Sequence, residues 1–439
     1  MTRRSALATL AAAPALLAVH GCGRTARGGA VELAYWEKWT KFEGQAAQDM
    51  VDAFNEEYEG RIHVTKVTTT QIERKLLIAI AGGNPPDVSG MYAFNVAPYA
   101  DRNAVHCLDD RLKAEGITRA DYIPVYWDLC EHRDAMWALP TAPATVALHW
   151  NKRLFREAGL DPERPPRTLA ELDAFAEKLT KRDPTTGEYA QMGFLPQEPG
   201  WWPWAWGFWF GGKLWNGSDT ITADEPANVR AFEWIASYST KYGVDAIKRF
   251  ASGFGNFSSP QNAFLAGKVA MEMQGVWMHN FINMYASGMQ WGAAPFPCAQ
   301  PGKDSVSIAD ADVIVIPRGS RHPDEAWEFV KFSNSQKGME ILCNGQRKFS
   351  PLAKVSDRFW EQHEHPYIKL FSDLAKGPSV ATAPQTGALN RYQEELRVAF
   401  DRVRNLNATP QEALGAVRER VQQALDRELR RLRRRGLIS

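Results

Sequence analysis

The chain has 439 residues, with 52 Lys and Arg against 51 Asp and Glu, and 44% of its residues are hydrophobic. This length is enough for two domains that each bury a core, and a charged fraction of 23% argues against a largely disordered chain. A net charge of +1 gives no overall field for binding nucleic acid or a membrane surface, and five cysteines are too few for a disulfide scaffold.

The first 22 residues have the features of an export leader. Arg3 and Arg4 precede an uncharged apolar stretch at 6–19, which suits a secretory signal core and is shorter than the roughly 20 residues that cross a bilayer. The stretch ends in Val19-His20-Gly21-Cys22, which resembles a bacterial lipobox. We expect residues 1–22 to be a signal peptide with lipobox and Cys22 to be lipidated. Simple cleavage stays open, as do both the Sec and the twin-arginine export routes.

Strands and helices are predicted to alternate from residue 31 onward. The patterns predict strands at 31–36, 62–67 and 87–92, with helices between them that cover 50–58 and 72–80. The second helix ends at a glycine- and proline-rich turn at 82–86. This alternation predicts parallel βαβ units with right-handed crossovers.

Similar alternation returns beyond Pro140. Thr168 and Glu171 form a capping-box pattern that starts a helix through 179, and 263–273 is predicted as a helix that runs into a strand. A strand at 312–316 and a helix at 326–332 follow.

A long amphipathic helix is predicted near the end of the chain. Thr409-Pro410-Gln411-Glu412 supplies its N-cap, its N1 proline and its N3 glutamate. Five arginines lie at 430–435, for which a solvated helix end and contact with anionic lipid both stay open.

The common enzyme motifs are missing from the sequence. It contains no G-x-S-x-G elbow, no P-loop, no G-x-G-x-x-G at a helix start, no H-E-x-x-H and no C-x-x-C. His363-Glu364-His365 is the one metal-like cluster, and its place in a polar loop favours a solvated surface. We therefore expect no catalytic residue, no cofactor and no metal. Disulfides and buried thiols are equally consistent with Cys107, Cys130, Cys298 and Cys343.

Aromatic residues are concentrated at 201–210, where seven of ten residues are Trp or Phe. Indoles combine a flat apolar face with one N–H donor, which suits the C–H faces of sugar rings. Packing inside the protein is the alternative, and we expect both, with about two of the five tryptophans reaching a ligand. Just upstream, Glu198 is predicted to accept hydrogen bonds from ring hydroxyls.

The ends of two predicted strands carry further candidates. Trp36, Lys38 and Trp39 come at the end of the first strand, and Tyr92 ends the third. Ligands of open α/β sheets bind beyond the carboxyl ends of the strands, so these side chains are predicted to line a site.

The chain resembles the extracellular solute-binding proteins of carbohydrate ABC importers, the group that includes maltodextrin and glycerol-phosphate binders. The segments that carry the resemblance follow the family's order, and they are 31–36, 78–88, 138–140, 148–155, 158–160, 263–271, 275–277, 313–317 and 326–332. The resemblance implies an α/β, two-lobed, periplasmic-binding-protein-like fold (type II). Each lobe is then a mainly parallel sheet flanked by helices, with a hinge between the lobes. Lobe 1 is expected at 30–142 plus 309–346, and lobe 2 at 143–308 plus 347–439.

The resemblance also implies roles for particular residues. Trp277 corresponds to a tryptophan that often stacks on sugar, and the loop at 197–199 resembles that of the maltodextrin binders. Met91 and Ala144 depart from those binders, which favours another sugar or oligosaccharide. The full set of expected ligand-binding residues is Trp36, Lys38, Trp39, Tyr92, Glu198, Trp201, Trp202, Trp277 and Asp310.

The expected function is capture of a sugar or oligosaccharide in the cleft between the lobes and its delivery to the permease subunits of an ABC transporter. The protein is expected to be an exported monomer with no enzymatic activity and no nucleic-acid partner. It is expected to lie in the periplasm or at the cell surface, anchored to the membrane only through lipidated Cys22. An exported carbohydrate-active enzyme and a solute-binding protein for a non-sugar ligand are the alternatives.

Overall fold

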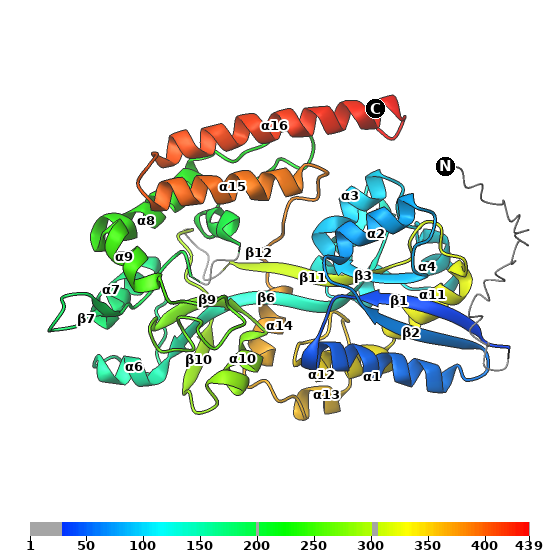
Figure 1. The fold of residues 1–439 in the computed structure, drawn as a ribbon, viewed down its shortest axis with the longest axis horizontal. Coiled ribbons are helices and arrows are strands. Elements are labelled where there is room, and N and C mark those ends of the chain that lie inside the picture. The colour runs from blue at the N-terminus through cyan, green and yellow to red at the C-terminus, as the bar shows by residue number, and fades with distance from the viewer. Residues whose placement is uncertain (1–28, 199–201, 301–305, 439) are drawn as a thin grey trace, which may run out of the picture.

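The computed structural model describes residues 29–198, 202–300 and 306–438. Helices gather around the two ends of one long sheet, which gives the molecule two lobes joined by continuous strands (Figure 1). The predicted α/β class and two-lobed arrangement are confirmed. The predicted signal peptide and Cys22 lie outside the described residues.

The first lobe begins with the predicted βαβ units. Strand β1 (Val31–Glu37) lies between β2 (Ile62–Thr68) and β3 (Val88–Tyr92) and is parallel to both. Helices α1 (Lys41–Glu57) and α2 (Ile72–Ala81) form the crossovers. The short elements that follow are η1 (Ala93–Asn95), α3 (Val96–Asp101), α4 (Asp109–Glu115), η2 (Arg119–Asp121), α5 (Pro124–Asp128), β4 (Glu131–His132) and β5 (Ala135–Met136).

Two strands run from one lobe into the other. These are β6 (Leu139–Asn151), which is buried along its whole length, and β11 (Ser307–Val315). They pair with each other in the antiparallel sense, and β11 also pairs antiparallel with β3. The short strand β12 (Val380–Ala381) pairs parallel with β11.

The sheet of the second lobe differs from the prediction of a mainly parallel sheet. Strands β9 (Met271–Gly275) and β10 (Trp291–Ala294) flank the far half of β6, and both are antiparallel to it. Strand β6 carries the chain from the first lobe into the second, and β9 and β10 run back toward the first lobe. In the described residues, eight strands thus form one mixed sheet across both lobes.

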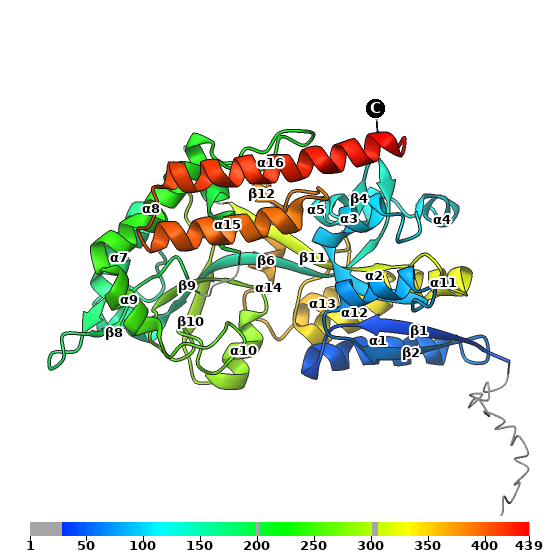
Figure 2. The same cartoon turned by 45° about the horizontal axis from the view of Figure 1, so that its top comes forward.

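Helices and short strands surround the second half of this sheet. In chain order they are α6 (Lys152–Glu157), α7 (Leu169–Leu179), β7 (Lys181–Arg182), β8 (Tyr189–Gln191), η3 (Pro203–Phe210), α8 (Pro226–Tyr242), α9 (Val244–Ala251), α10 (Met278–Tyr285), α15 (Leu389–Arg404) and α16 (Pro410–Arg434). Helices α15 and α16 lie side by side along one side of the molecule (Figure 2). Arg435, just beyond α16, reaches the first lobe, where its Nη1 donates to the carbonyl of Asp101 at 2.7 Å.

The helix predicted to run from residue 263 into β9 is wrong. Residues 263–267 form turns, although the Asn262 side chain accepts hydrogen bonds from the backbone N–H groups of Phe264 and Leu265 as a helix N-cap would. Gly267 then adopts a φ of +67°, which is left-handed and ends the turn.

The expected lobe boundary at 346/347 also differs from the observed packing. Helices α11 (Pro323–Ser333) and α12 (Gln336–Gln346) belong to the first lobe, and α13 (Asp357–Glu361) and α14 (Ile368–Lys376) follow them. Phe349, Ile368 and Phe371 are buried in the first lobe's core cluster. The chain joins the second lobe's core only from Ala388 onward. Burial of this apolar segment against β6 and α5 explains why it stays with the first lobe.

Cys107 and Cys130, the two cysteines closest in sequence, are both free thiols, and so is the buried Cys343. Across the described residues, no helix is both long and apolar enough to traverse a bilayer.

The predicted capping box at the start of α16 is present. Thr409 Oγ1 accepts from the Glu412 N–H at 3.3 Å, and Glu412 Oε2 accepts from the Thr409 N–H at 3.0 Å. Thr409→Ala removes the first bond, so we expect the free energy of unfolding to fall by about 1 kcal/mol in chemical denaturation. Thr240→Ala, an exposed substitution inside α8, is the control and should not lower it. Equal losses in both variants would contradict the role of the cap.

Candidate functional site

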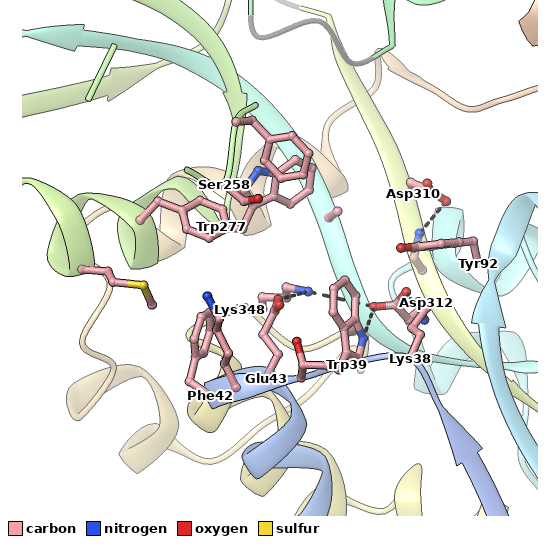
Figure 3. A pocket seen from close by; sticks show the side chains of 18 of the residues that line it. Lys38, Trp39, Phe42, Glu43, Tyr92, Ser258, Trp277, Asp310, Asp312 and Lys348 are labelled. Carbon is pink, nitrogen blue, oxygen red and sulfur yellow. Dashed lines mark hydrogen bonds and ion pairs between the residues drawn. The ribbon is translucent and has the colours of Figure 1, made fainter. Parts of the chain in front are cut away.

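A cavity of about 470 Å³ lies where the two lobes meet (Figure 3). One wall comes from the first lobe, at the carboxyl ends of β1 and β3 and the start of α1. The opposite wall comes from the second lobe, around the start of α10, and the crossing strands β6 and β11 contribute between them. Its lining includes Lys38, Trp39, Phe42, Glu43, Tyr92, Ala144, Trp202, Phe257, Trp277, Phe281, Asp310, Asp312 and Lys348.

An ion-pair network centred on Asp312 organises the first-lobe wall. Lys38 Nζ lies 2.8 Å from one Asp312 oxygen, and Trp39 Nε1 donates to the other at 3.1 Å. Lys38 Nζ also lies 3.5 Å from Glu37. Burial alone would lower the pKa of Lys38, but the carboxylates of Asp312 and Glu37 outweigh it and hold the pKa above its ordinary value. Lys38 is therefore a paired, charged group that also lies over the ring of Tyr92 at 4.5 Å.

The second lysine of this wall is paired as well. Lys348 Nζ lies 3.5 Å from Glu43 and 4.0 Å from Asp312, and it is 4.8 Å from the centre of the Trp39 ring. Because carboxylates already balance both Lys38 and Lys348, the network leaves little uncompensated positive charge facing the cavity.

Asp310 is the exception among the acidic residues of the cavity. Its carboxylate accepts a hydrogen bond from the backbone N–H of Ala311 at 2.8 Å, and within the described part of the chain it forms no ion pair. Burial raises the pKa of Asp310 to about 7, with a further contribution from the negative charge of Asp312. The carboxyl group is thus poised to accept hydrogen bonds from a ligand that enters the cavity.

Aromatic rings form the second-lobe wall. The centres of the Trp202 and Trp277 rings are 6.3 Å apart and nearly perpendicular, and Phe257 lies 6.1 Å from Trp277. Trp277 Nε1 donates to Gln274 Oε1 at 2.9 Å, which fixes the orientation of the indole. Gly275 makes room for the ring, since a Cβ there would lie 2.4 Å from its atoms. This wall offers flat apolar faces opposite the polar groups of the first lobe.

Six of the nine predicted ligand-binding residues line this cavity. They are Lys38, Trp39, Tyr92, Trp202, Trp277 and Asp310. Trp201 lies outside the described residues.

Trp36 and Glu198 are not among the lining residues. Trp36 lies within strand β1, which extends one residue past the predicted end, and it is paired in register with Val67 and Ser89 and packs against the first lobe's core. Glu198 is partly buried in the second lobe, and burial raises the pKa of its carboxyl to about 7.

The described part of the aromatic segment is divided between the cavity and the core. Trp202 reaches the cavity from a left-handed φ of 51°, immediately before η3. Trp204, Trp206 and Trp209 are buried in the second lobe's core. Trp209 Nε1 donates to the Val306 carbonyl at 2.9 Å, so its single polar group is satisfied there.

Several lining residues were not predicted from the sequence. Phe42 and Glu43 follow Lys38 and Trp39 closely, so the start of α1 held a signal for them. Phe257 lies in an irregular segment, and Lys348 follows the left-handed Arg347 at the end of α12. Neither position carries a periodic pattern that points to a cavity.

The prediction of a solvated surface at His363 and His365 is wrong for His365, which is only 1% exposed. Among the described residues, no group of three or more His, Cys, Asp or Glu side chains has an arrangement that holds a metal ion.

Known proteins match this chain over about one third to two thirds of its length. Residues 40–340 match the family described as bacterial extracellular solute-binding protein. The maltotriose-binding protein of Pyrococcus abyssi (strain GE5 / Orsay) is 23% identical over 318 residues, which cover 69% of this chain and 62% of that protein. UgpB, the sn-glycerol-3-phosphate-binding periplasmic protein of Escherichia coli (strain K12), is 28% identical over 153 residues, or 32% of this chain and 34% of UgpB. The matches thus span about one third to two thirds of these relatives.

Solved structures match more completely. CpMnBP1 with mannotriose bound has a TM-score of 0.77 and 29% identity, covering 89% of this chain and 100% of that chain. The maltose/maltodextrin-binding domain MalE of Bdellovibrio bacteriovorus, bound to maltotriose, has a TM-score of 0.71 and 18% identity, covering 91% and 100%. The second similarity shows the shared two-lobed fold. Since the family match extends over most of the sequence, this chain belongs to the bacterial extracellular solute-binding protein family.

Proposed function

We propose that this protein captures a neutral oligosaccharide in the cavity between its lobes and delivers it intact to an ABC permease. The observation that carries the proposal is the pairing of an indole wall with a polar wall. Trp202 and Trp277 offer stacking faces, and Tyr92 and Asp310 lie across the cavity from Trp277 (Figure 3). Apolar faces edged with hydroxyl groups match such an arrangement.

The relatives indicate which sugars to test first. CpMnBP1 was solved with mannotriose and with mannobiose. The match covers 89% of the present chain, and the two sequences are 29% identical. Short mannose oligosaccharides are therefore our first candidates. Maltotriose is the second, because the Pyrococcus abyssi relative is named for it.

The charge balance of the cavity supports a neutral ligand over a phosphate ester. A phosphate needs unpaired cationic groups, whereas Lys38 and Lys348 are already engaged by Asp312 and Glu43. A glycerol phosphate of the kind named for the UgpB relatives fits this wall less well.

The same balance supports binding without cleavage. Glycoside hydrolysis uses two carboxyl groups, one as proton donor and one as nucleophile or base. Here Asp312 and Glu43 are held in ion pairs with lysines, which leaves Asp310 as the single uncompensated carboxyl among the described lining residues.

We also propose that the protein is exported to the periplasm or cell surface and anchored through lipidated Cys22. The support is the leader pattern at 1–22 together with membership in an extracellular family. In this view the protein acts as a monomer, and its partners are the permease subunits and the sugar.

The direct test is a binding panel on residues 23–439. Calorimetry and thermal unfolding would be measured with mannobiose, mannotriose, maltotriose, sn-glycerol 3-phosphate and the polyamine putrescine. We expect saturable binding of an oligosaccharide, which at a hundred times its Kd adds about 2.7 kcal/mol to stability, and recovery of the sugar intact. Binding of the phosphate ester or polyamine alone would contradict the proposal, and so would release of reducing ends.

Two of the predicted tryptophans, Trp277 and Trp36, give a matched pair of variants. Trp277→Ala removes a lining indole, so we expect a loss of at least about tenfold in oligosaccharide affinity by calorimetry, since one aromatic platform is worth roughly 1–2 kcal/mol. Trp36→Ala is the matched control, because Trp36 packs on the core outside the cavity. Its affinity should stay within about twofold of wild type even if its stability falls. Equal losses of affinity in both variants would remove Trp277 from the site.

Asp310 should make the binding of the ligand depend on pH. Ligand hydroxyls stabilise its charged form, so binding lowers a pKa that stands at about 7 in the free protein. Affinity should therefore rise about tenfold between pH 6 and pH 8, and Asp310→Asn should flatten that rise. Glu198→Gln is the matched control, because burial also raises the pKa of Glu198 to about 7 but the residue does not line the cavity. A flat wild-type profile, or one flattened by Glu198→Gln, would contradict this role for Asp310.

A further inference from the structure

Four of the nine histidines of the chain gather where the two lobes meet, next to the cavity. His149 lies on β6, His279 on α10, and His363 and His365 in the loop before α14. The ring centres of His279 and His365 are 4.7 Å apart, and those of His363 and His365 are 6.5 Å apart. The Trp291 ring stacks on His149 at 5.4 Å and contacts His365 edge-on at 5.9 Å.

The backbone contacts of His365 determine where its proton lies. Its Nδ1 accepts a hydrogen bond from the N–H of Tyr367 at 3.1 Å, so this nitrogen carries no proton. The Nε2–H group then donates to the carbonyl of Val276, also at 3.1 Å. The ring is neutral in this arrangement, because a proton on Nδ1 would face the N–H of Tyr367.

His363 is held in the same way. Its Nδ1 accepts from the N–H of His365 at 3.1 Å, and its Nε2–H donates to the carbonyl of Lys348 at 3.1 Å. Both rings thus act as bridges that function only in the neutral form.

The two carbonyls that accept these bonds belong to opposite walls of the cavity. Val276 directly precedes Trp277 of the aromatic wall, and Lys348 is the paired lysine of the first-lobe wall. Asn280 adds a third link nearby, since its Nδ2 donates to the Gln346 carbonyl at 3.0 Å. The loop 363–367 therefore connects the backbone on both sides of the site.

We propose that His363 and His365 are positioning residues that clasp the Trp277 wall to the Lys348 wall while neutral and release them when protonated, so that the protein gives up its ligand in acid. This inference rests on the proposed function, because it assigns the control of that same cavity.

The charged groups around the clasp favour the neutral rings. From β6 and α10, the clasp faces the imidazoles of His149 and His279. His149 Nε2 and His279 Nδ1 are buried and have no hydrogen-bond partner among the described residues. From the end of α12 come the cations Arg347 and Lys348. The one carboxylate of the loop, Glu364, is bonded to Arg347 Nε at 2.5 Å and so is already engaged.

The titration of these groups agrees with this geometry. Burial lowers the pKa of all four histidines from the ordinary value of 6.5, to about 3 for His149 and to about 4 for His279. When the clasp is open or the chain is unfolded, these imidazoles bind protons near pH 6.5, whereas in the clasped form they do not. The clasp is therefore fully retained above pH 6.5 and weakens progressively as the pH falls below it.

The first test needs no ligand. Long-range ¹H–¹⁵N spectra of the imidazoles report which ring nitrogen carries the proton. We expect His363 and His365 to be Nε2–H tautomers at pH 7.5 and to resist protonation until well below pH 6.5. An Nδ1–H tautomer at His365, or its titration near pH 6.5, would overturn the proposal whatever sugar the protein binds.

The second test uses substitutions at His365 and an oligosaccharide from the panel that binds at pH 7.5. The side chain of His365→Gln retains a donor for the Val276 carbonyl but does not titrate, whereas His365→Ala removes the donor. We expect His365→Ala to lose roughly fivefold in affinity at pH 7.5 and His365→Gln to stay near wild type.

The decisive comparison is the pH profile in an Asp310→Asn background, where the cavity carboxyl no longer contributes. There we expect affinity to fall at least tenfold from pH 7 to pH 5, and adding His365→Gln should reduce that fall to less than threefold. His322→Gln, at the start of α11, is the control and should leave the profile unchanged. A profile that His365→Gln does not alter would refute the clasp. Absence of any oligosaccharide binding by wild type would instead refute the proposed function and leave the spectra to decide on the clasp.

Discussion

The antiparallel pairing of β6 with β11 links the two lobes and positions both walls of the cavity. Both strands run from one lobe into the other, so every residue of the cavity is positioned relative to them. Strand β11 carries Asp310 and Asp312 at the register shift between Ala311 and Val313, and Asp312 in turn holds Lys38. The far half of β6 aligns β9, whose end leads directly to Trp277. One strand pair therefore sets both the polar and the aromatic wall.

The chemistry of the cavity follows from how its charges are balanced. Burying lysines is costly unless carboxylates pair with them, and the Asp312 network meets that requirement for Lys38 and Lys348. The same pairing makes these groups rigid and leaves Asp310 to respond to a ligand. A rigid neutral wall opposite fixed indoles is suited to a polar but uncharged molecule, which is the property common to sugars. The histidine clasp adds a second set of buried groups whose neutral state holds the two walls together.

Much of the first lobe was predictable from the sequence, because hydrophobic periodicity follows local burial. The βαβ order and the end of β3 at Tyr92 come from short-range patterns, and so does the cap at Thr409 in the second lobe. Most of the failures have long-range causes. Trp36 ends the predicted first strand and was expected to line the site, but pairing with β2 extends β1 to Glu37 and the Trp36 side chain packs on the first lobe's core. Residues 263–267 are apolar enough for a helix, and Asn262 caps them as it would cap one, but the left-handed Gly267 ends the segment after a single turn. Lys348 and His365 owe their roles to contacts with segments that are distant in sequence. Local sequence patterns carry no information about such contacts.

The proposed function requires one oligosaccharide to bridge both walls of the cavity. A crystal structure of residues 23–439 with the tightest-binding sugar of the panel would show whether it does. We expect a sugar ring stacked on Trp277, with hydroxyl groups within hydrogen-bond distance of Asp310 across the cavity. A sugar bound to one lobe alone, or away from Trp277 and Asp310, would contradict it.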